Sequence, residues 1–393
     1  MPKKKVNLEI PEDALKEMEM DKDSDIVLEI SNKQGTLFDK NHSFDQQNQS
    51  LRWFLIPSVV ATLLFYFYAL YQNIHYISIT GTHSIATLTN TLGLTSGILC
   101  FTIAFVLIKK DKRFGLAKRI YWRNFPAILI SFSIILFLCI LLFFKVLGTI
   151  FFGLRFDIYT STALFFFFVC IINYAMIYLA STLSPQLLIK LLTVVIVGGV
   201  LIAMATNSDA LWWQHNFSFL GTLEANRRWQ FNLTLILSAI LMIALLDYLF
   251  VALKEIYPHS KKLFLLKTLL VLTALNLGGV GFFPYSDGTF SGRMHNTVAG
   301  NLVYLILLLI LLIRWLLPNV SKEFLTFSYL TGVILFLTTL LFVKVHYLSL
   351  TAFELFAFLL AFSWLLLLLQ QLEKIVEHNL NTYQLAFSPT KEE

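Results

Sequence analysis

The sequence predicts an all-α integral membrane protein, a polytopic bundle of about ten transmembrane helices. The 393-residue chain is 57% hydrophobic and only 14% charged, whereas an average soluble domain is about 25% charged. Apolar runs long enough to cross a hydrocarbon core of about 30 Å recur from Trp53 to Leu369. The runs are continuous and not alternating, which argues against a barrel. Lipid offers no partners to free backbone groups, so the runs must be helical.

The ten helices are expected in order along the chain, each closed by a short polar turn. Pro185, for example, stops the short turn between the fourth and fifth runs. The expected helices cover about residues 53–72, 87–108, 124–146, 159–182, 187–206, 230–253, 263–284, 296–317, 324–344 and 349–371.

Basic residues predict the orientation. Lys and Arg gather in the loops at residues 109–123, 254–262 and 314–322, all on one side of the bundle, whereas residues 73–86 contain neither. Cytoplasmic loops carry the excess of Lys and Arg. We therefore expect both the N- and the C-terminus to be cytoplasmic, and residues 207–221 and 282–299 to face outward.

Composition divides the chain into four expected parts. Residues 1–50 are polar and mostly acidic, and they contain too little apolar surface to fold alone. They are expected to form a disordered cytoplasmic tail. Residues 51–186 are rich in Phe and Leu, and we expect them to form a four-helix accessory bundle. Residues 187–372 contain the glycine pairs and the intramembrane charges, and we expect them to form a six-helix working domain. Residues 373–393 are expected to form a cytoplasmic tail.

Two classes of partner and site are disfavoured. Cys100, Cys139 and Cys170 all lie within apolar runs, so they read as buried apolar residues and not as a disulfide or zinc framework. The net charge of +6 comes from loops beside membrane segments. The expected partner is therefore the lipid bilayer and not nucleic acid. No residue pattern points to a particular cofactor, and no spacing matches a metal site.

The first candidate site is the outward loop at residues 207–221. Trp212 and Trp213 are flanked by Asp209 and His215. The tryptophans alone are explained by an interfacial aromatic belt. A short amphipathic helix would instead place Trp212 and His215 on one face, with Asp209 a turn earlier, to hold a lipid headgroup.

The second candidate is the turn at residues 282–299. Pro284 ends a helix, and Asp287 with Gly288 signals a tight turn. His295 follows at the expected start of the next helix. A neutral imidazole suits a general base or a metal ligand, and a protonated one suits a partner for Asp209 or Asp287; a structural hydrogen bond is an equal alternative.

Intramembrane charges supply the remaining candidates. Glu354 lies about five residues into the last expected helix, where a carboxylate is costly and needs a partner. With Asp209 and His295 it would form an outward-facing polar cluster. Asp247 and Lys267 lie at similar depth in consecutive helices, so we expect a structural ion pair between them; snorkelling of Lys267 is the alternative.

The C-terminal half resembles a bacterial six-helix family known as domain of unknown function 998, a distant relative of the Frag/DRAM/Sfk group. The matching features are WWQHNFSFLG from Trp212 to Gly221, the Phe283–Pro284 pair, His295 followed by Ala299, and LTAFE ending at Glu354. The family would have a basic residue after that acid, whereas this chain has Leu355. The resemblance implies a bacterial plasma-membrane location and brings no established activity.

Three functions remain open. The first is a sensor, an accessory protein or a binder of a lipid headgroup or envelope component at the outer face, through Trp212, Trp213, His215 and Asp287. The second is an intramembrane lipid-modifying hydrolase that uses His295 with Asp209 or Glu354. The third is a proton-coupled transporter in which Glu354 titrates. Whether the chain is an enzyme is left undecided by these residues.

Overall fold

Helices make up most of the described part of the protein. The computed structural model describes residues 6–9, 26–31, 34–39, 52–110, 122–207, 211–225, 227–317, 320–380 and 386–389. Within these residues, ten helical stretches are long and apolar enough to cross a membrane. The prediction of an all-α, ten-helix membrane bundle is confirmed.

The first four spans form an N-terminal set. They consist of α2 (Arg52–Tyr71), then α3 (Ile85–Leu88), the π-helical turn η1 (Thr89–Gly93) and α4 (Leu94–Lys110) as one span, then η2 (Trp122–Asn124) with α6 (Phe125–Ile150), and α7 (Ile158–Ser181).

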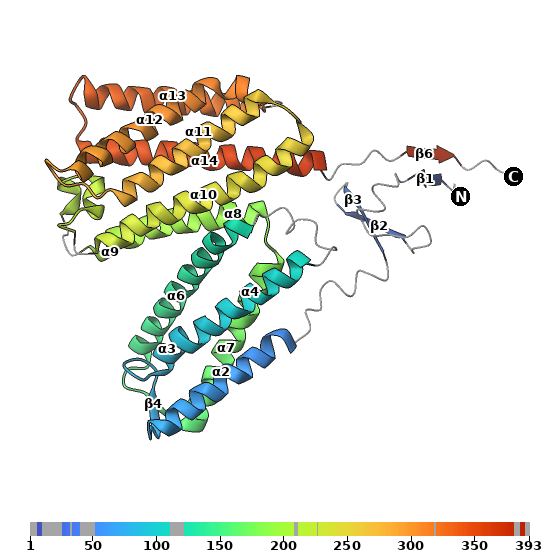
Figure 1. Ribbon diagram of the computed structural model, residues 1–393, viewed down its shortest axis with the longest axis vertical. Coiled ribbons are helices and arrows are strands. Elements are labelled where there is room, and N and C mark those ends of the chain that lie inside the picture. The colour runs from blue at the N-terminus through green and yellow to red at the C-terminus, as the bar shows by residue number, and fades with distance from the viewer. Residues whose placement is uncertain are drawn as a thin grey trace.

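The last six spans form a C-terminal set. They consist of α8 (Pro185–Thr193), the π-helical turn η3 (Val194–Gly198) and α9 (Gly199–Thr206) as one span, followed by α10 (Arg228–Ile256), α11 (Lys261–Phe282), α12 (Phe290–Leu316), α13 (Lys322–Val343) and α14 (Leu350–Leu380). The two sets lie one above the other along the long axis of the molecule (Figure 1).

Local sequence explains where many of the helices begin. A Ser, Thr or Asp side chain accepts a hydrogen bond from a backbone N–H of the first turn, which satisfies a group that the helix itself cannot pair. These N-cap residues are Ser84, Asp157, Ser184, Ser260, Thr289 and Ser321. Pro185 follows its cap directly, in the position where proline costs no hydrogen bond.

The N-terminal set packs through aromatic side chains. Phe65 of α2 stacks on Phe165 of α7 with ring centroids 4.4 Å apart, and both rings are fully buried. At one end of this set, β4 (Tyr76–Ser78) pairs antiparallel with β5 (Arg155–Asp157). This two-stranded ribbon ties the loop after α2 to the loop before α7.

The C-terminal set is organised around α10. This helix has 78% of its most apolar 18-residue stretch buried, against 22–44% in the other nine spans. This helix contacts α6, α8, α9, α11 and α14, so it lies in the middle of the set. One continuous core runs from Phe101 and Ile128 of the N-terminal set to Leu245 of α10 and Leu368 of α14. The division near residue 186 stays a proposal.

The described ends of the chain lie together. β1 (Val6–Glu9) pairs antiparallel with β6 (Ala386–Pro389), and β2 (Ile26–Ser31) pairs with β3 (Gln34–Asp39). The disorder predicted for the rest of residues 1–50 lies outside the described residues. Ten crossings, an even number, return the chain to the side from which it started. That this side is cytoplasmic stays a prediction.

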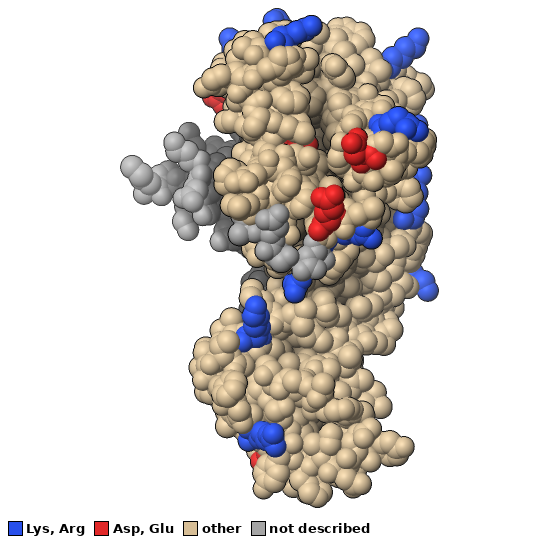
Figure 2. Space-filling model, turned by 90° about the vertical axis from the view of Figure 1, so that its left-hand side faces the viewer, with Lys and Arg blue, Asp and Glu red and all other residues tan. Residues whose placement is uncertain are grey.

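We name the two ends of the bundle by their loops. The motif end carries the described residues of 72–84, 151–157, 207–227, 283–289 and 344–349, and the terminal end carries β1 and β6 (Figure 1). Figure 2 looks onto the motif end and shows scattered Lys, Arg, Asp and Glu side chains on a largely uncharged surface.

Several helices extend beyond the expected limits. α14 continues nine residues past residue 371, to Leu380, because its polar last turns are still good helix formers. α12 begins at Phe290, six residues before the expected start, since Thr289 caps it. His295 therefore lies in the second turn of α12, and not at its start.

Candidate functional site

Glu354 holds the loop between α9 and α10. It lies in the second turn of α14, and its Oε2 accepts hydrogen bonds from the backbone N–H groups of Phe217 (2.6 Å) and Ser218 (3.2 Å). Its Oε1 accepts a hydrogen bond from Ser218 Oγ at 2.9 Å. The loop carries two 3-10 turns, η4 (Trp212–Gln214) and η5 (Phe217–Gly221). Glu354 therefore satisfies the free N–H groups at the start of η5, as a capping carboxylate does at a helix N-terminus.

Two further contacts fasten the same loop. Thr351 Oγ1, one turn before Glu354, donates to the carbonyl of Trp213 at 2.8 Å. Asn232 Nδ2 of α10 donates to the carbonyl of Gly221 at 3.0 Å. Each contact joins the loop backbone to a membrane helix, so the loop is a folded part of the bundle.

An apolar cluster lies beneath the loop. Phe217 is buried between Phe231 of α10, at 5.4 Å between ring centroids, and Phe358 of α14, at 5.5 Å. Val280 of α11 belongs to the cluster, and Val298 of α12 packs against it. The loop and parts of five helices, α9 included, therefore share one core.

His295 lies on the α11–α12 side of this cluster and is only 4% exposed. Its Nδ1 lies 2.8 Å from the carbonyl oxygen of Phe283. A carbonyl oxygen only accepts, so Nδ1 carries the hydrogen and donates. In the neutral ring Nε2 is then the acceptor. Nε2 is buried and has no hydrogen-bond partner among the described residues.

The turn before His295 is tight. Ser291 Oγ donates to the carbonyl of Pro284 at 2.7 Å. Gly292 lies so close to the carbonyl of Ser286 that any Cβ at this position would overlap it. Asp287 Oδ1 accepts a hydrogen bond from the N–H of Gly288 at 2.9 Å, and no hydrogen bond joins Asp287 to His295. Asp287 therefore shapes the turn, and His295 fixes the turn to α12.

The other predicted residues of the 207–221 loop are separated. Asp209 lies outside the described residues. The described part of this stretch forms two short 3-10 turns, η4 and η5, in place of the predicted alternative, a short amphipathic helix. Trp212 packs on Phe217 (6.4 Å between ring centroids), and His215 stacks on Phe219 at 4.5 Å. Trp213 is 53% exposed, which fits an interfacial anchor.

His295 and Glu354 have different partners. His295 bonds to the α11–α12 turn, whereas Glu354 bonds to η5. In the described part of the chain, no group of three or more His, Cys, Asp or Glu residues is placed to hold a metal ion. Among the described residues, the structure brings together a pair of loops over a shared apolar cluster; the predicted cluster with Asp209 stays a prediction.

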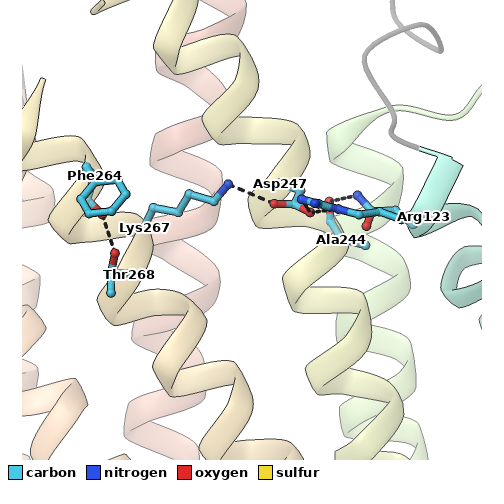
Figure 3. Close-up of polar contacts among 7 residues, drawn as sticks. Arg123, Ala244, Asp247, Phe264, Lys267 and Thr268 are labelled. Atoms are coloured by element: carbon cyan, nitrogen blue, oxygen red, sulfur yellow. Dashed lines mark hydrogen bonds and ion pairs between the residues drawn. The ribbon is translucent and has the colours of Figure 1, made fainter. Parts of the chain in front are cut away.

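A second polar constellation lies toward the terminal end (Figure 3). Asp247 of α10 is 6% exposed, and its Oδ1 lies 3.0 Å from Lys267 Nζ of α11. On its other side Asp247 Oδ2 accepts from Arg123, through Nε at 3.0 Å and also through Nη2. The predicted pair is thus part of a triad. Beside it, Asn124 Nδ2 lies 3.5 Å from the carbonyl of Ala244.

Sequence reasoning foresaw neither the ion pair of Arg123 with Asp247 nor the contact of Ser218 with Glu354. Arg123 reads as one of several basic residues in a loop, and its partner is 124 positions away. Ser218 is part of the WWQHNFSFLG motif, yet nothing in the motif marks it as the hydroxyl that meets Glu354. The sequence indicates that Glu354, a carboxylate inside the membrane, needs a hydrogen-bond partner, but it does not identify that partner.

Comparison with known proteins gives one match. No curated protein and no solved structure matches the chain. A family model described as "Protein of unknown function (DUF998)" matches residues 191–371, from the end of α8 to the middle of α14. The match confirms the resemblance: the C-terminal half of this membrane protein carries the DUF998 domain.

Proposed function

We propose that this chain is a sensor or accessory protein of a bacterial plasma membrane, and that its motif end faces outward and binds the polar part of a lipid or envelope component. The basic residues of the loops at the terminal end support this orientation. The family resemblance supports the location.

One observation carries the proposal. The Nε2 atom of His295 is a buried acceptor without a partner among the described residues. Buried polar groups are nearly always hydrogen-bonded, so an orphan acceptor calls for an explanation. A bound donor group that enters between the α11–α12 turn and the cluster around Phe217 would supply one.

The tautomer defines the chemistry of the ligand. Nδ1 is committed to Phe283, so Nε2 accepts and the ligand must donate. A hydroxyl group fits this requirement, and hydroxyls occur both on lipid headgroups and on envelope sugars. Exposed Trp213 on the neighbouring loop is suited to the headgroup region.

The hydrolase is the second candidate, since a buried imidazole with a free Nε2 is also the form that acts as a general base. On the neighbouring loop a carboxylate orients the hydroxyl of Ser218, but this hydroxyl is bonded to Glu354 and not to His295. The transporter hypothesis depends on Glu354, which already accepts three hydrogen bonds from the loop. The engagement of Ser218 and Glu354 with each other therefore favours a binding protein over a hydrolase or a transporter.

Replacement of His295 by Asn tests the proposal. The Asn amide nitrogen can take the place of Nδ1 and keep the bond to Phe283, while the Nε2 position is lost. The matched variant His295→Gln places its amide near Nε2 and gives up the bond to Phe283. Mass spectrometry of lipids and glycans retained by purified protein should show a hydroxyl-bearing compound in wild type that is lost in His295→Asn.

Identical retained compounds in wild type and His295→Asn would refute the proposal. A turned-over lipid product, formed by wild type and not by His295→Asn, would establish the hydrolase instead. Metal analysis of the same samples checks whether Nε2 binds a cation and not a donor group.

A further inference from the structure

We propose that two copies of this chain associate within the membrane through the exposed face of α12, with Asn301 at the centre of the contact. The proposal is independent of the function proposed for His295, because it concerns the lipid-facing surface and not the loops of the motif end.

Polar side chains line a groove on this surface. The groove has a volume of about 290 Å³ and lies between α11 and α12, lined by Leu272, Asn276, Asn301, Tyr304, Leu305 and Leu308. No charged residue lines it. Asn276 donates to the carbonyl of Leu272 of its own helix at 2.8 Å. Asn301 is exposed, and Tyr304 is 71% exposed.

The depth of Asn301 makes its exposure costly. α12 has 27 residues, which at 1.5 Å per residue span about 40 Å. Asn301 lies eleven residues after Phe290, about 16 Å from that end, so it is deep within a hydrocarbon core of about 30 Å. No hydrogen bond joins its amide to any described residue. Water is absent at this depth, so the amide needs a partner from another molecule.

The exposed face of α12 is continuous and has room for a second helix. Thr297, Gly300, Asn301, Tyr304 and Leu308 recur at helical spacing along it, and Thr297, Asn301, Tyr304 and Leu308 are exposed. A Cβ atom at Gly300 would meet nothing within 4 Å, so the backbone is open to close approach. Small residues beside a polar amide are typical of helix–helix contacts in membranes.

Self-complementary chemistry selects a second copy as the occupant. An Asn amide carries both donors and an acceptor, so it pairs with the same amide across a twofold axis. The protruding Tyr304 can lie in the groove of the other copy, where its hydroxyl meets Asn276 or Asn301. No charge on the face repels its equivalent.

Disulfide crosslinking in native membranes tests this contact. In the full chain with Cys100, Cys139 and Cys170 replaced by Ser or Ala, Gly300→Cys is compared with Val333→Cys on α13. Val333 is a matched control because it is 56% exposed and lies ten residues from the motif end of its helix, as Gly300 does. Mild oxidation should give a dimer-sized product for Gly300→Cys several times more abundant than for Val333→Cys.

A second substitution checks that Asn301 holds the contact. Asn301→Leu should lower the crosslinked fraction severalfold, whereas Asn301→Gln should keep most of it. Equal crosslinking at Gly300 and Val333, no effect of Asn301→Leu, or a product whose mass includes another protein would each overturn the proposal. Monodisperse elution of each purified variant verifies that it is folded.

Discussion

The two helix sets of this protein differ in the kind of polar side chain that they bury. Among the described residues of the N-terminal set, the buried polar side chains are uncharged, such as Ser58, Ser131 and Asn173, and Asn173 Nδ2 bonds to Ser58 Oγ at 2.9 Å. In the described part of the C-terminal set, Asp247, His295 and Glu373 are all buried. Ionisable groups inside a membrane bundle are costly and often functional, so their place in the C-terminal set, which includes the residues that the family model matches, supports the proposal that the function lies in this set.

Glycines sharpen the contrast between the sets. In the C-terminal set, a Cβ at Gly281 would lie 2.6 Å from the carbonyl of Asn232, so α10 and α11 touch through their backbones. In the N-terminal set, a Cβ at Gly97 would lie 2.8 Å from the Ile172 side chain, and side chains can shift more easily than backbone. The central helix of the C-terminal set is therefore packed with less room for adjustment than the aromatic N-terminal core.

The largest effect is expected from Asp247→Ala, which breaks the only described ion-pair cluster that spans both sets. The change leaves Lys267 and Arg123 without their shared partner. Loss of one member of a fully buried pair costs about 3–5 kcal/mol. Because Lys267 and Arg123 are 32% and 66% exposed, we expect about 2–4 kcal/mol, measured by thermal or denaturant unfolding in detergent.

The control for this change is Glu224→Ala, which removes an exposed carboxylate from a loop. It should leave the unfolding midpoint close to that of wild type. An Asp247→Ala variant as stable as Glu224→Ala would mean that the triad does not join the two sets.

The next effect is expected at the adjacent glycines of the fifth span. Gly199→Ala would force a methyl group into the Thr234 side chain of α10, and overpacking of this kind costs about 1–3 kcal/mol. Gly198→Ala meets nothing within 4 Å and should be neutral or stabilising by up to about 1 kcal/mol. Unfolding of the two variants side by side gives the difference; equal stabilities would show that α9 moves freely against α10.

A local effect is expected from Glu354→Gln. The amide keeps the size of the side chain but has one acceptor oxygen in place of two, and it loses the negative charge that strengthens three hydrogen bonds. We expect a loss of about 1–2 kcal/mol of local stability. Hydrogen–deuterium exchange at the amides of Phe217 and Ser218 should become faster.

Glu373→Gln serves as the comparison for that change. Glu373 lies near the other end of α14, and its Oε1 accepts from Gln186 Nε2 at 2.9 Å. Its replacement should leave exchange at Phe217 and Ser218 unchanged. Unchanged exchange in Glu354→Gln itself would show that Thr351 and Asn232 hold the loop without the carboxylate.

The smallest effect is expected in the N-terminal set, at Asp157. Its carboxylate accepts hydrogen bonds from Thr160 Oγ1 (2.6 Å) and from the N–H groups of Thr160 and Tyr159. These hydrogen bonds lower the pKa of Asp157 below its ordinary value. The largest contribution comes from the Thr160 hydroxyl, and the N–H groups of Thr160 and Tyr159 add to it. The stabilisation is therefore present above the pKa of the unfolded chain, and it is lost as pH falls through the lowered pKa of the folded state.

The pH dependence of Asp157→Ala measures this contribution. The variant should be slightly less stable than wild type at neutral pH, and the two should converge as the solution is acidified below the ordinary pKa of an aspartate. A difference that persists unchanged at acidic pH would show that charge plays no part in capping α7.

Much of the fold follows from local sequence. The ten spans are read from apolar runs of membrane length, since lipid permits a single backbone solution. Each N-cap bonds to a backbone N–H group of the helix that directly follows it in the sequence, so capping depends on local sequence. These caps are Ser84, Asp157, Ser184, Ser260, Thr289 and Ser321. The ends of α12 and α14 were missed, because a helix continues past the apolar run wherever the next residues still favour it.

The partners of the buried charges follow from tertiary structure alone. The sequence by itself determined that Glu354 lies within the membrane and needs a partner, and that Asp247 and Lys267 lie at similar depth. Only the packed bundle decided that Glu354 bonds to the backbone of Phe217 and Ser218, 136 or more positions away, and that Arg123 completes the triad. Backbone N–H groups are present in nearly every residue, so no pattern of side chains marks the two that the fold brings to a carboxylate.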